Sequence, residues 1–220
     1  MNARTLTLLS LSSLFAVACV DDVGEGRVAA EVVEEAAPAE GAAGEAAEAA
    51  PAVEGTQLAV DTSRSRIHAL GAKVTATHAV EFDEWTGSIT FTGEDVAAFE
   101  VTVQMAGLRA DRDRLTGHLK NEDFFNVEQW PTASFRSSAV VAEPGPDGAT
   151  HKVTGDLTMR DTTKTISFPA TVEITDTDVS AKTEFVINRQ DFGLAYPGRP
   201  DDLIQDNVAM TIELTAGRGE

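Results

Sequence analysis

The sequence has one cysteine, Cys19, among its 220 residues, and it lies near the amino terminus. A single cysteine cannot form an intramolecular disulfide, which excludes a disulfide-stapled scaffold. Cys19 also precedes the region whose pattern is typical of a folded domain. Thiol catalysis inside that domain is therefore excluded, and a role for Cys19 in core packing is a poor explanation.

Basic residues are scarce, with 17 Lys and Arg against 36 Asp and Glu, which gives a formal net charge of -19. Proteins that bind nucleic acid neutralise its phosphates with clusters of Lys and Arg, so no nucleic-acid partner is expected. No apolar run reaches the roughly 20 residues that a membrane-spanning helix needs. We therefore expect no transmembrane helix.

The usual catalytic and metal-binding motifs are missing. The four histidines, His68, His78, His118 and His151, are scattered, with no H-E-x-x-H motif. There is no G-x-S-x-G nucleophile motif, and carboxylate pairs discriminate nothing in so acidic a chain. We expect no catalytic residues, no metal and no cofactor. A metal-assisted hydrolase stays open only if two or more of the histidines converge in the fold.

The first 18 residues have the composition of a signal peptide. One cation, Arg4, precedes a run of mostly Leu, Ser, Val, Phe and Ala that ends at Ala18. The small residues before Cys19 resemble the lipobox of bacterial lipoproteins, in which the cysteine receives a diacylglyceryl group and becomes the mature amino terminus. Ala16-Val17-Ala18 also fits the ordinary A-x-A cleavage pattern. We expect residues 1–18 to be removed and Cys19 to be the lipid attachment site.

Residues 19–56 are expected to form a lipidated amino terminus and a disordered acidic linker. The stretch is mostly Ala and Glu, with prolines and glycines, and it holds ten acidic residues against Arg27 alone. It has no aromatic residue and few large aliphatic ones, so it lacks the means to build a core. Repulsion between its charges favours an extended tether.

From Gln57 onward the apolar pattern changes to a period of two, which is the signal of half-buried strands. About eight strands are predicted, and turn residues separate them. They lie at residues 66–76, 85–92, 99–105, 132–141, 151–159, 166–174, 179–187 and 208–214.

One stretch, Asp111 to Trp130, lacks this alternation and is predicted to hold a short helix, with Asp111 or Asp113 as its amino-terminal cap. Strands with one apolar face must bury that face, either in a sandwich or by closing into a barrel. We therefore expect an all-β antiparallel domain over residues 57–217. Arg189 is a candidate structural residue that pairs with Asp191 or Asp206.

Several segments together resemble successive signatures of the YceI-like family, and they follow one another in order. They are "VDTSRSRIHALGAKVTATH", "LTGHLKNEDFFNVEQWPTASFRSS", "GDLTMRDTTKTISFPATV", "INRQDFGL" and "LIQDNVAMTIEL". The resemblance implies an extended, eight-stranded, lipocalin-like antiparallel barrel in the bacterial periplasm or cell envelope. It also implies that the barrel binds a polyisoprenoid or a similar long apolar lipid. Asp161 departs from the family pattern, which usually has Gly in that turn.

If the barrel holds such a ligand, its walls come from large apolar residues on inward faces and on the helical stretch. The cavity candidates are Trp85, Phe91, Phe99, Met105, Phe124, Phe125, Trp130, Phe135, Phe168 and Phe185. A charged headgroup needs cations near the opening, for which the candidates are Arg112, Arg114, Lys120, Arg160 and Lys164. A packed core and a lined cavity use the same residue types, so core packing remains the alternative for each aromatic residue.

The expected function is non-catalytic carriage or sequestration of a long-chain isoprenoid or similar apolar lipid. The protein is expected to be exported to the cell envelope and anchored in the membrane through Cys19, and two copies can pair as a homodimer. The alternative is an envelope protein with a filled barrel and no ligand, which acts in stress tolerance or adhesion. An extended apolar cavity favours the first interpretation, and a packed interior favours the second.

Overall fold

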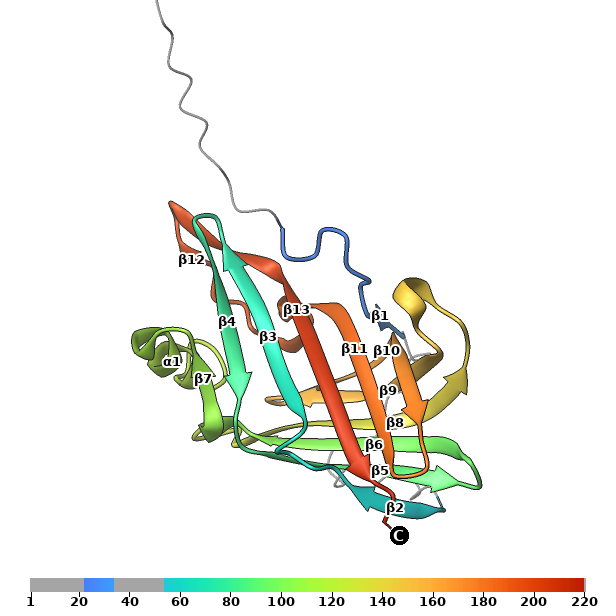
Figure 1. Cartoon of the computed structure of the whole chain (residues 1–220). Coiled ribbons are helices and arrows are strands. Elements are labelled where there is room, and N and C mark those ends of the chain that lie inside the picture. Colours follow the sequence, from blue (N-terminus) through green and yellow to red (C-terminus); the bar gives the residue numbers. More distant parts are fainter. Residues whose placement is uncertain (1–21, 34–53, 220) are drawn as a thin grey trace, which may run out of the picture.

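The computed structural model describes residues 22–33 and 54–219, which fold into one curled antiparallel sheet (Figure 1). Eleven strands follow one hydrogen-bonded path, on which each strand pairs with the next. In path order they are β2 (Thr56–Ala59), β5 (Trp85–Thr92), β6 (Asp95–Gln104), β8 (Thr132–Ala142), β9 (His151–Met159), β10 (Thr162–Ile174), β11 (Asp178–Asn188), β13 (Asp202–Gly217), β3 (Arg66–Lys73), β4 (Ala76–Phe82) and β7 (Leu108–Ala110). Two short strands lie off this path: β1 (Glu31–Val32) pairs with β10, and β12 (Gly198–Arg199) pairs with β13.

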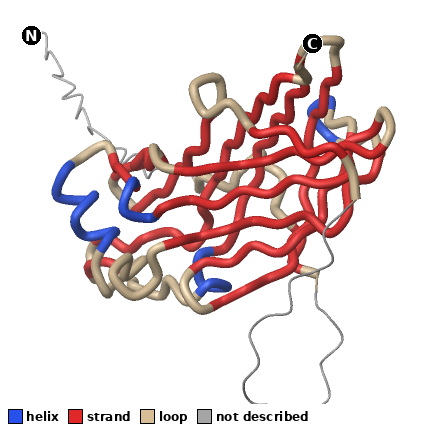
Figure 2. The backbone as a smooth tube through the Cα atoms, turned by 90° about the horizontal axis from the view of Figure 1, so that it is seen from below, coloured by secondary structure: helices blue, strands red, loops and turns tan. Residues whose placement is uncertain are grey.

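The sheet curls so that β3, β4, β11 and β13 lie over β5, β6, β8 and β9, which run across them (Figure 1). Strands make up most of the body, with short helical segments between them (Figure 2). These are α1 (Asp113–Lys120) and the 3-10 segments η1 (Met105–Gly107), η2 (Pro146–Gly148) and η3 (Arg189–Phe192). The all-β antiparallel prediction and the single short helix are thereby confirmed.

The number of strands differs from the expected eight, since the described residues place eleven on the main path. The pattern missed β4, because its inward side carries a polar residue, His78, after the small Ala76, and only Val80 and Phe82 are large and apolar. The short strands at the ends of the path are also too brief to show a period of two. The predicted strand of residues 66–76 covers β3 and the turn to β4.

The strands next to the two ends of the path are joined at one corner, where β4 runs into β5 through Asp83 and Glu84. The Gln104 amide donates to the Glu84 carbonyl at 2.8 Å, and the Asp83 amide donates to the Gly107 carbonyl at 3.3 Å. A Cβ on Gly107 would lie 2.6 Å from the Glu84 Cβ. Only glycine allows this approach, which carries the chain from one end of the path to the other.

Helix α1 begins one residue after Arg112, which occupies the cap position in extended conformation and makes no side-chain cap bond. The prediction that Asp111 or Asp113 caps the helix is therefore wrong. Asp113 lies instead in the first turn, where a carboxylate interacts favourably with the helix dipole. Thr116 ties the helix to β7, because its hydroxyl accepts the Ala110 amide at 2.9 Å.

Residues 22–33, which we call the N-terminal arm, are bound to the sheet rather than extended as a linker. Val23 is buried with 4% exposure, and the ion pair from Arg27 to Glu184 joins the arm to β11. Strand β1 pairs with β10. This part of the expected linker therefore differs from the prediction, because the sheet supplies backbone partners that the composition of the arm does not reveal. Signal peptide, Cys19 and residues 34–53 lie outside the described residues.

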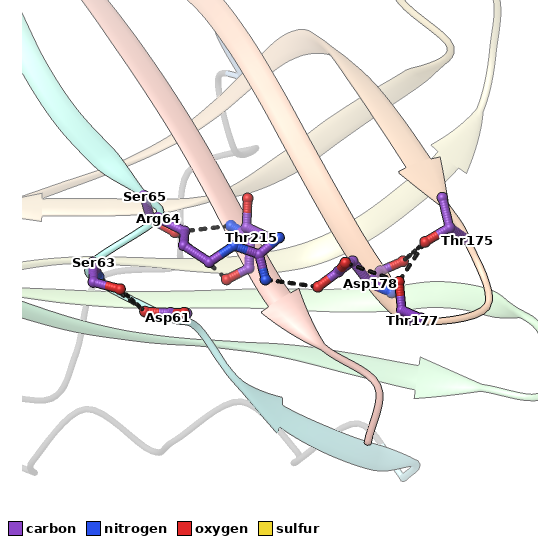
Figure 3. Close-up of polar contacts among 8 residues, drawn as sticks. All are labelled: Asp61, Ser63, Arg64, Ser65, Thr175, Thr177, Asp178 and Thr215. Atoms are coloured by element: carbon purple, nitrogen blue, oxygen red, sulfur yellow. Dashed lines mark hydrogen bonds and ion pairs between the residues drawn. The ribbon is translucent and has the colours of Figure 1, made fainter. Parts of the chain in front are cut away.

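A polar cluster joins two loops and strand β13 at one end of the strands (Figure 3). The Arg64 guanidinium donates to Asp178 at 2.8 Å, and Asp178 also accepts the Thr177 hydroxyl at 2.9 Å. The Ser65 hydroxyl accepts the Thr215 amide at 2.8 Å. Arg64 and, to a lesser degree, Thr177 hold the pKa of Asp178 below its usual range.

This lowered pKa predicts how Asp178 contributes to stability as pH changes. The unfolded carboxyl titrates near pH 4 and the folded one below it, so the contribution is present above about pH 4 and is lost as pH falls through the folded pKa. Wild type should therefore be more stable than Asp178→Asn at pH 6, and the difference in free energy of unfolding should shrink between about pH 4 and 2. Urea denaturation across this range measures it.

The matched control is Asp176→Asn, in the same turn, for which the described part of the chain shows no hydrogen bond or ion pair. Its difference from wild type should stay small at every pH. A difference for Asp178→Asn that does not change with pH would contradict the role of the ion pair with Arg64.

Candidate functional site

The curled sheet encloses an inner cavity of about 120 Å³. Side chains from β3, β4, β6, β8 to β11 and β13 reach it, because alternate residues of each strand point to the same face. Of its 23 lining residues, only Ser134 and Thr183 carry a side-chain hydroxyl, and none is charged. The interior therefore offers a ligand dispersion contacts and exclusion from water, and almost no hydrogen bonds.

Six of the ten predicted cavity residues line this inner cavity. They are Phe99, Met105, Phe125, Phe135, Phe168 and Phe185. Three of them form an aromatic wall: Phe168 stacks on Phe185 with ring centroids 4.3 Å apart, and Phe135 lies tilted against Phe168 at 5.4 Å. Four of the six come from different strands, Met105 comes from η1, and Phe125 comes from a loop.

The other four predicted cavity residues lie elsewhere. Trp85 and Phe91 are buried in the core outside the lining of the inner cavity. Trp130 packs beneath the Arg160 guanidinium, 4.5 Å from its ring centroid. Phe124 lies in a cluster with His118 and Tyr196, at centroid distances of 5.1 and 5.3 Å, and lines the wider opening described below rather than the inner cavity. Trp85, Phe91 and Trp130 line neither space.

The sequence analysis selected aromatic residues and missed much of the wall. Met159, Met210 and Phe82 line the inner cavity together with aliphatic residues. With Met105, every methionine other than Met1 faces this space. Methionine side chains are unbranched and adapt to irregular volumes, so this wall can change shape when a ligand enters. The alternation along the predicted strand of residues 208–214 could have identified Met210 as an inward-facing residue.

A wider opening, which we call the mouth, has a volume of about 920 Å³. Phe82 and Phe125 line both the mouth and the inner cavity, so the two spaces adjoin at these side chains. The mouth lies between α1 and the ends of β3, β4 and β13 that are near β12. The inner cavity alone is smaller than the roughly 300–1,000 Å³ of typical ligand sites, and the mouth brings the site into that range.

The mouth is cationic although the chain as a whole is strongly acidic. Its charged and histidine lining residues are Lys73, His78, Arg112, Arg114, His118, Arg189, Arg199 and Asp202. Lys73 forms an ion pair with Asp202, which lowers the pKa of that carboxyl. Within the described part of the chain, the guanidinium groups of Arg112, Arg114 and Arg199 make no hydrogen bond or ion pair. These three are positioned to receive an anion.

Arg112 and Arg114 were predicted to meet a headgroup, and both line the mouth. The other three predicted headgroup residues do not. Lys120 donates to the Ala106 carbonyl, and Arg160 covers Trp130. Lys164 lies on β10 opposite Leu157. Lys73 and Arg199, which the sequence analysis did not select, come from strands far apart in the chain and carried no local signal.

The model of the YceI-like domain matches residues 58–216, which is most of the chain. The protein belongs to the YceI-like domain family. Two solved structures show the same fold. One is BcnA of Burkholderia cenocepacia, with a TM-score of 0.60 at 22% identity, covering 71% of this chain and 99% of BcnA. The other is a polyisoprenoid binding domain from Saccharophagus degradans, with a TM-score of 0.58 at 14% identity, covering 72% of this chain and 97% of that one.

Two relatives in sequence are UPF0312 proteins. A UPF0312 protein of Photorhabdus laumondii is 36% identical over 87 residues, which are 39% of this chain and 43% of that protein. This YceI-like chain therefore matches less than half of that relative's length. A UPF0312 protein of Pseudomonas putida is 27% identical over 137 residues, covering 59% of this chain and 70% of the relative.

Two of the four histidines of this YceI-like domain pair separately with carboxylates. His78 Nδ1 lies 3.0 Å from Asp111, and His118 Nε2 lies 3.1 Å from Asp123. Both histidines line the mouth, while His68 and His151 do not. Over residues 22–33 and 54–219, no group of three or more His, Cys, Asp and Glu is arranged to hold a metal ion. The same residues include no helix long and apolar enough to cross a bilayer.

Proposed function

We propose that this protein binds a long-chain apolar lipid of the isoprenoid class and carries or sequesters it without chemistry. The observation that carries the proposal is an uncharged inner cavity that adjoins a cationic mouth. In this arrangement the tail lies among Phe135, Phe168 and Phe185. The headgroup lies in the mouth near Arg112 and Arg114.

Burial of the tail is favourable but does not by itself make the site selective. Each CH2 group gains roughly 0.8 kcal/mol when it leaves water. Isoprenoid lipids, however, are already out of water in a membrane, so this gain is nearly cancelled. Transfer from a membrane to the protein therefore depends on the shape of the cavity and on contacts with the headgroup.

A filled barrel that acts through its outer surface is the alternative function. The inner cavity disfavours it, because natural cores leave few voids larger than a water molecule. Three methionines in the wall also favour a space that adapts to an occupant over one that is packed once.

Native mass spectrometry tests the proposed function directly. The protein is purified from its bacterial host without detergent, and bound material is then extracted into organic solvent. A stoichiometric long-chain lipid is the expected result and names the ligand class. A protein that is empty and also refuses added isoprenoids would contradict the proposal and favour the filled-barrel alternative.

The cationic mouth predicts how a change in headgroup affects affinity. Arg112→Ser combined with Arg114→Ser should weaken binding of an isoprenoid with an anionic headgroup about tenfold, or roughly 1.4 kcal/mol. Binding of the corresponding isoprenoid alcohol should change much less. Fluorescence titration with both ligands measures the difference, and Lys120→Ser serves as a control on the same helix but outside the mouth. Equal losses for both ligands would contradict a headgroup role.

We also propose that Cys19 anchors the protein in a membrane of the cell envelope; this residue lies outside the described range. The support is the signal-peptide composition before it and the lipobox-like residues Ala16 to Ala18. Cys19→Ser is expected to move the exported protein from the membrane fraction to the soluble fraction. Continued membrane attachment of that variant, measured by fractionation and immunoblotting, would contradict the anchor.

A further inference from the structure

The ladder between β10 and β11 ends halfway along the two strands. Only Thr171–Ile174 of β10 pairs with Val179–Lys182 of β11. Beyond this point Pro169 has no amide hydrogen to donate, and its carbonyl accepts the Thr183 hydroxyl at 2.6 Å instead of a backbone amide. The remainder of β10 therefore separates from β11 and leaves an opening between the strands.

The N-terminal arm fills this opening (Figure 1). On the β10 side, Glu31 and Val32 pair with Ser167 and Ile166, and the Val33 amide donates to the Thr165 carbonyl at 2.8 Å. On the β11 side, Val186 bonds to the arm twice. Its carbonyl accepts the Ala30 amide at 2.8 Å, and its amide donates to the Val28 carbonyl at 2.9 Å. The arm thus satisfies backbone groups on both edges of the opening.

The walls of the opening are also walls of the inner cavity. Ile166 and Phe168 on β10, and Phe185 and Ile187 on β11, all line that cavity. The stacked rings of Phe168 and Phe185 meet across the gap between the two strands. Ala30 of the arm packs against the same core. A passage between β10 and β11 would therefore lead directly into the apolar interior.

The N-terminal arm makes few buried contacts with the sheet, although it lies against a wall of the inner cavity. Val23 is its only buried hydrophobic residue among residues 22–33, while Val32 and Val33 are 39% and 44% exposed. Its ion pairs, from Arg27 to Glu184 and from Lys152 to Glu31, lie at the surface, where such pairs contribute little. Segments with few buried contacts open at low free-energy cost, so the arm can leave while the sheet stays folded.

We propose that the opening between β10 and β11 is a side entrance for the apolar chain of the ligand, and that the N-terminal arm is the strap that closes it. The inference rests on the proposed function. A long tail that enters through the mouth must pass among Lys73, Arg112 and Arg114. A tail that enters from the side reaches Phe168 and Phe185 without crossing charged groups, and the headgroup stays at the mouth.

A reversible lock on the strap tests this proposal. Glu31 and Ser167 are direct partners in the ladder, and the Cα atoms of such antiparallel partners lie about 4.5–5.5 Å apart, within the range that a disulfide spans. The mature chain with Cys19→Ser, Glu31→Cys and Ser167→Cys is compared oxidised and reduced, so each sample is its own control. The probe is cis-parinaric acid, a fluorescent 18-carbon chain with a carboxylate. Stopped flow measures its uptake, and transfer to phosphatidylcholine vesicles measures its release.

Oxidation is expected to slow uptake and release by at least tenfold each and to leave the equilibrium dissociation constant within about twofold, since the lock blocks the path and not the site. Val23→Ser, which loosens the strap, should accelerate both rates. Equal rates in the oxidised and reduced protein, with probe bound in both, would overturn the side entrance and leave the mouth as the route. Failure of every variant to bind the probe would overturn the proposed function and the entrance with it.

Discussion

Replacement of Ala181 by phenylalanine is expected to weaken binding of long-chain apolar ligands by more than tenfold, or above roughly 1.4 kcal/mol. Ala181 lies on β11 and its side chain lines the inner cavity. A cavity of about 150 Å³ accommodates one benzene, so a phenyl ring occupies most of a cavity of about 120 Å³. Titration with cis-parinaric acid measures the loss.

The neighbouring substitution Lys182→Phe is the matched control. Residue 182 is next on the same strand and points to the outer face, where its amine pairs with Glu213. It should change affinity less than twofold. Because the new ring in Ala181→Phe fills space that was empty, its free energy of unfolding should stay within about 1 kcal/mol of wild type. Unchanged ligand binding in a folded Ala181→Phe protein would show that the inner cavity is not the binding site.

The fold was predictable where burial sets the residue pattern. Trp85 to Thr92 alternates between apolar and hydroxyl side chains and forms β5 with the predicted bounds. The same alternation placed Phe99, Phe135 and Phe168 on inward faces, where they line the cavity. An alternating pattern does not, however, predict where a long strand begins and ends, because different parts of such a strand pair with different neighbours. The predicted strand of residues 208–214 is the centre of β13, which runs from Asp202 to Gly217.

The arm shows why composition alone misjudged part of the linker. Residues 22–33 are rich in Ala, Val and Glu, and nothing in them requires a strand. The reason for β1 lies more than 130 residues away, where Pro169 ends the ladder of β10 with β11 and leaves backbone groups without partners. Backbone hydrogen bonding of this kind depends on the partner strand and is invisible in the sequence of the arm itself.

The mouth was predictable only in the part that one segment contributes. Arg112 and Arg114 belong to a stretch that holds several basic residues close together and lacks the alternation of a strand. Both residues line the mouth. Lys73 and Arg199 come from the ends of β3 and β12, which only the topology brings together. Arg160 and Lys120 failed as headgroup residues because each is already engaged by its own neighbours, Trp130 and Ala106.

The largest loss of stability is expected from Arg189→Met. The Arg189 side chain is 5% exposed, and its guanidinium donates to four backbone carbonyls, those of Leu194, Tyr196, Ile204 and Gln205. It also bonds Asp206 at 2.8 Å, which is one of the two partners that the sequence suggested. Methionine keeps much of the aliphatic stem and removes every donor. We expect the free energy of unfolding to fall by about 3–5 kcal/mol, since buried acceptors lose a charged donor.

Arg109→Met is the control, because Arg109 pairs with Asp83 at 2.8 Å while its side chain is 63% exposed. An exposed pair contributes roughly 0–1 kcal/mol, so this variant should unfold at nearly the same urea concentration as wild type. Both arginines bond an aspartate, and only Arg189 also holds the loop after η3 to β13. A loss for Arg189→Met no larger than that for Arg109→Met would show that the loop folds without this donor. The mouth, which Arg189 lines together with Leu194 and Tyr196, would then be shaped by packing alone.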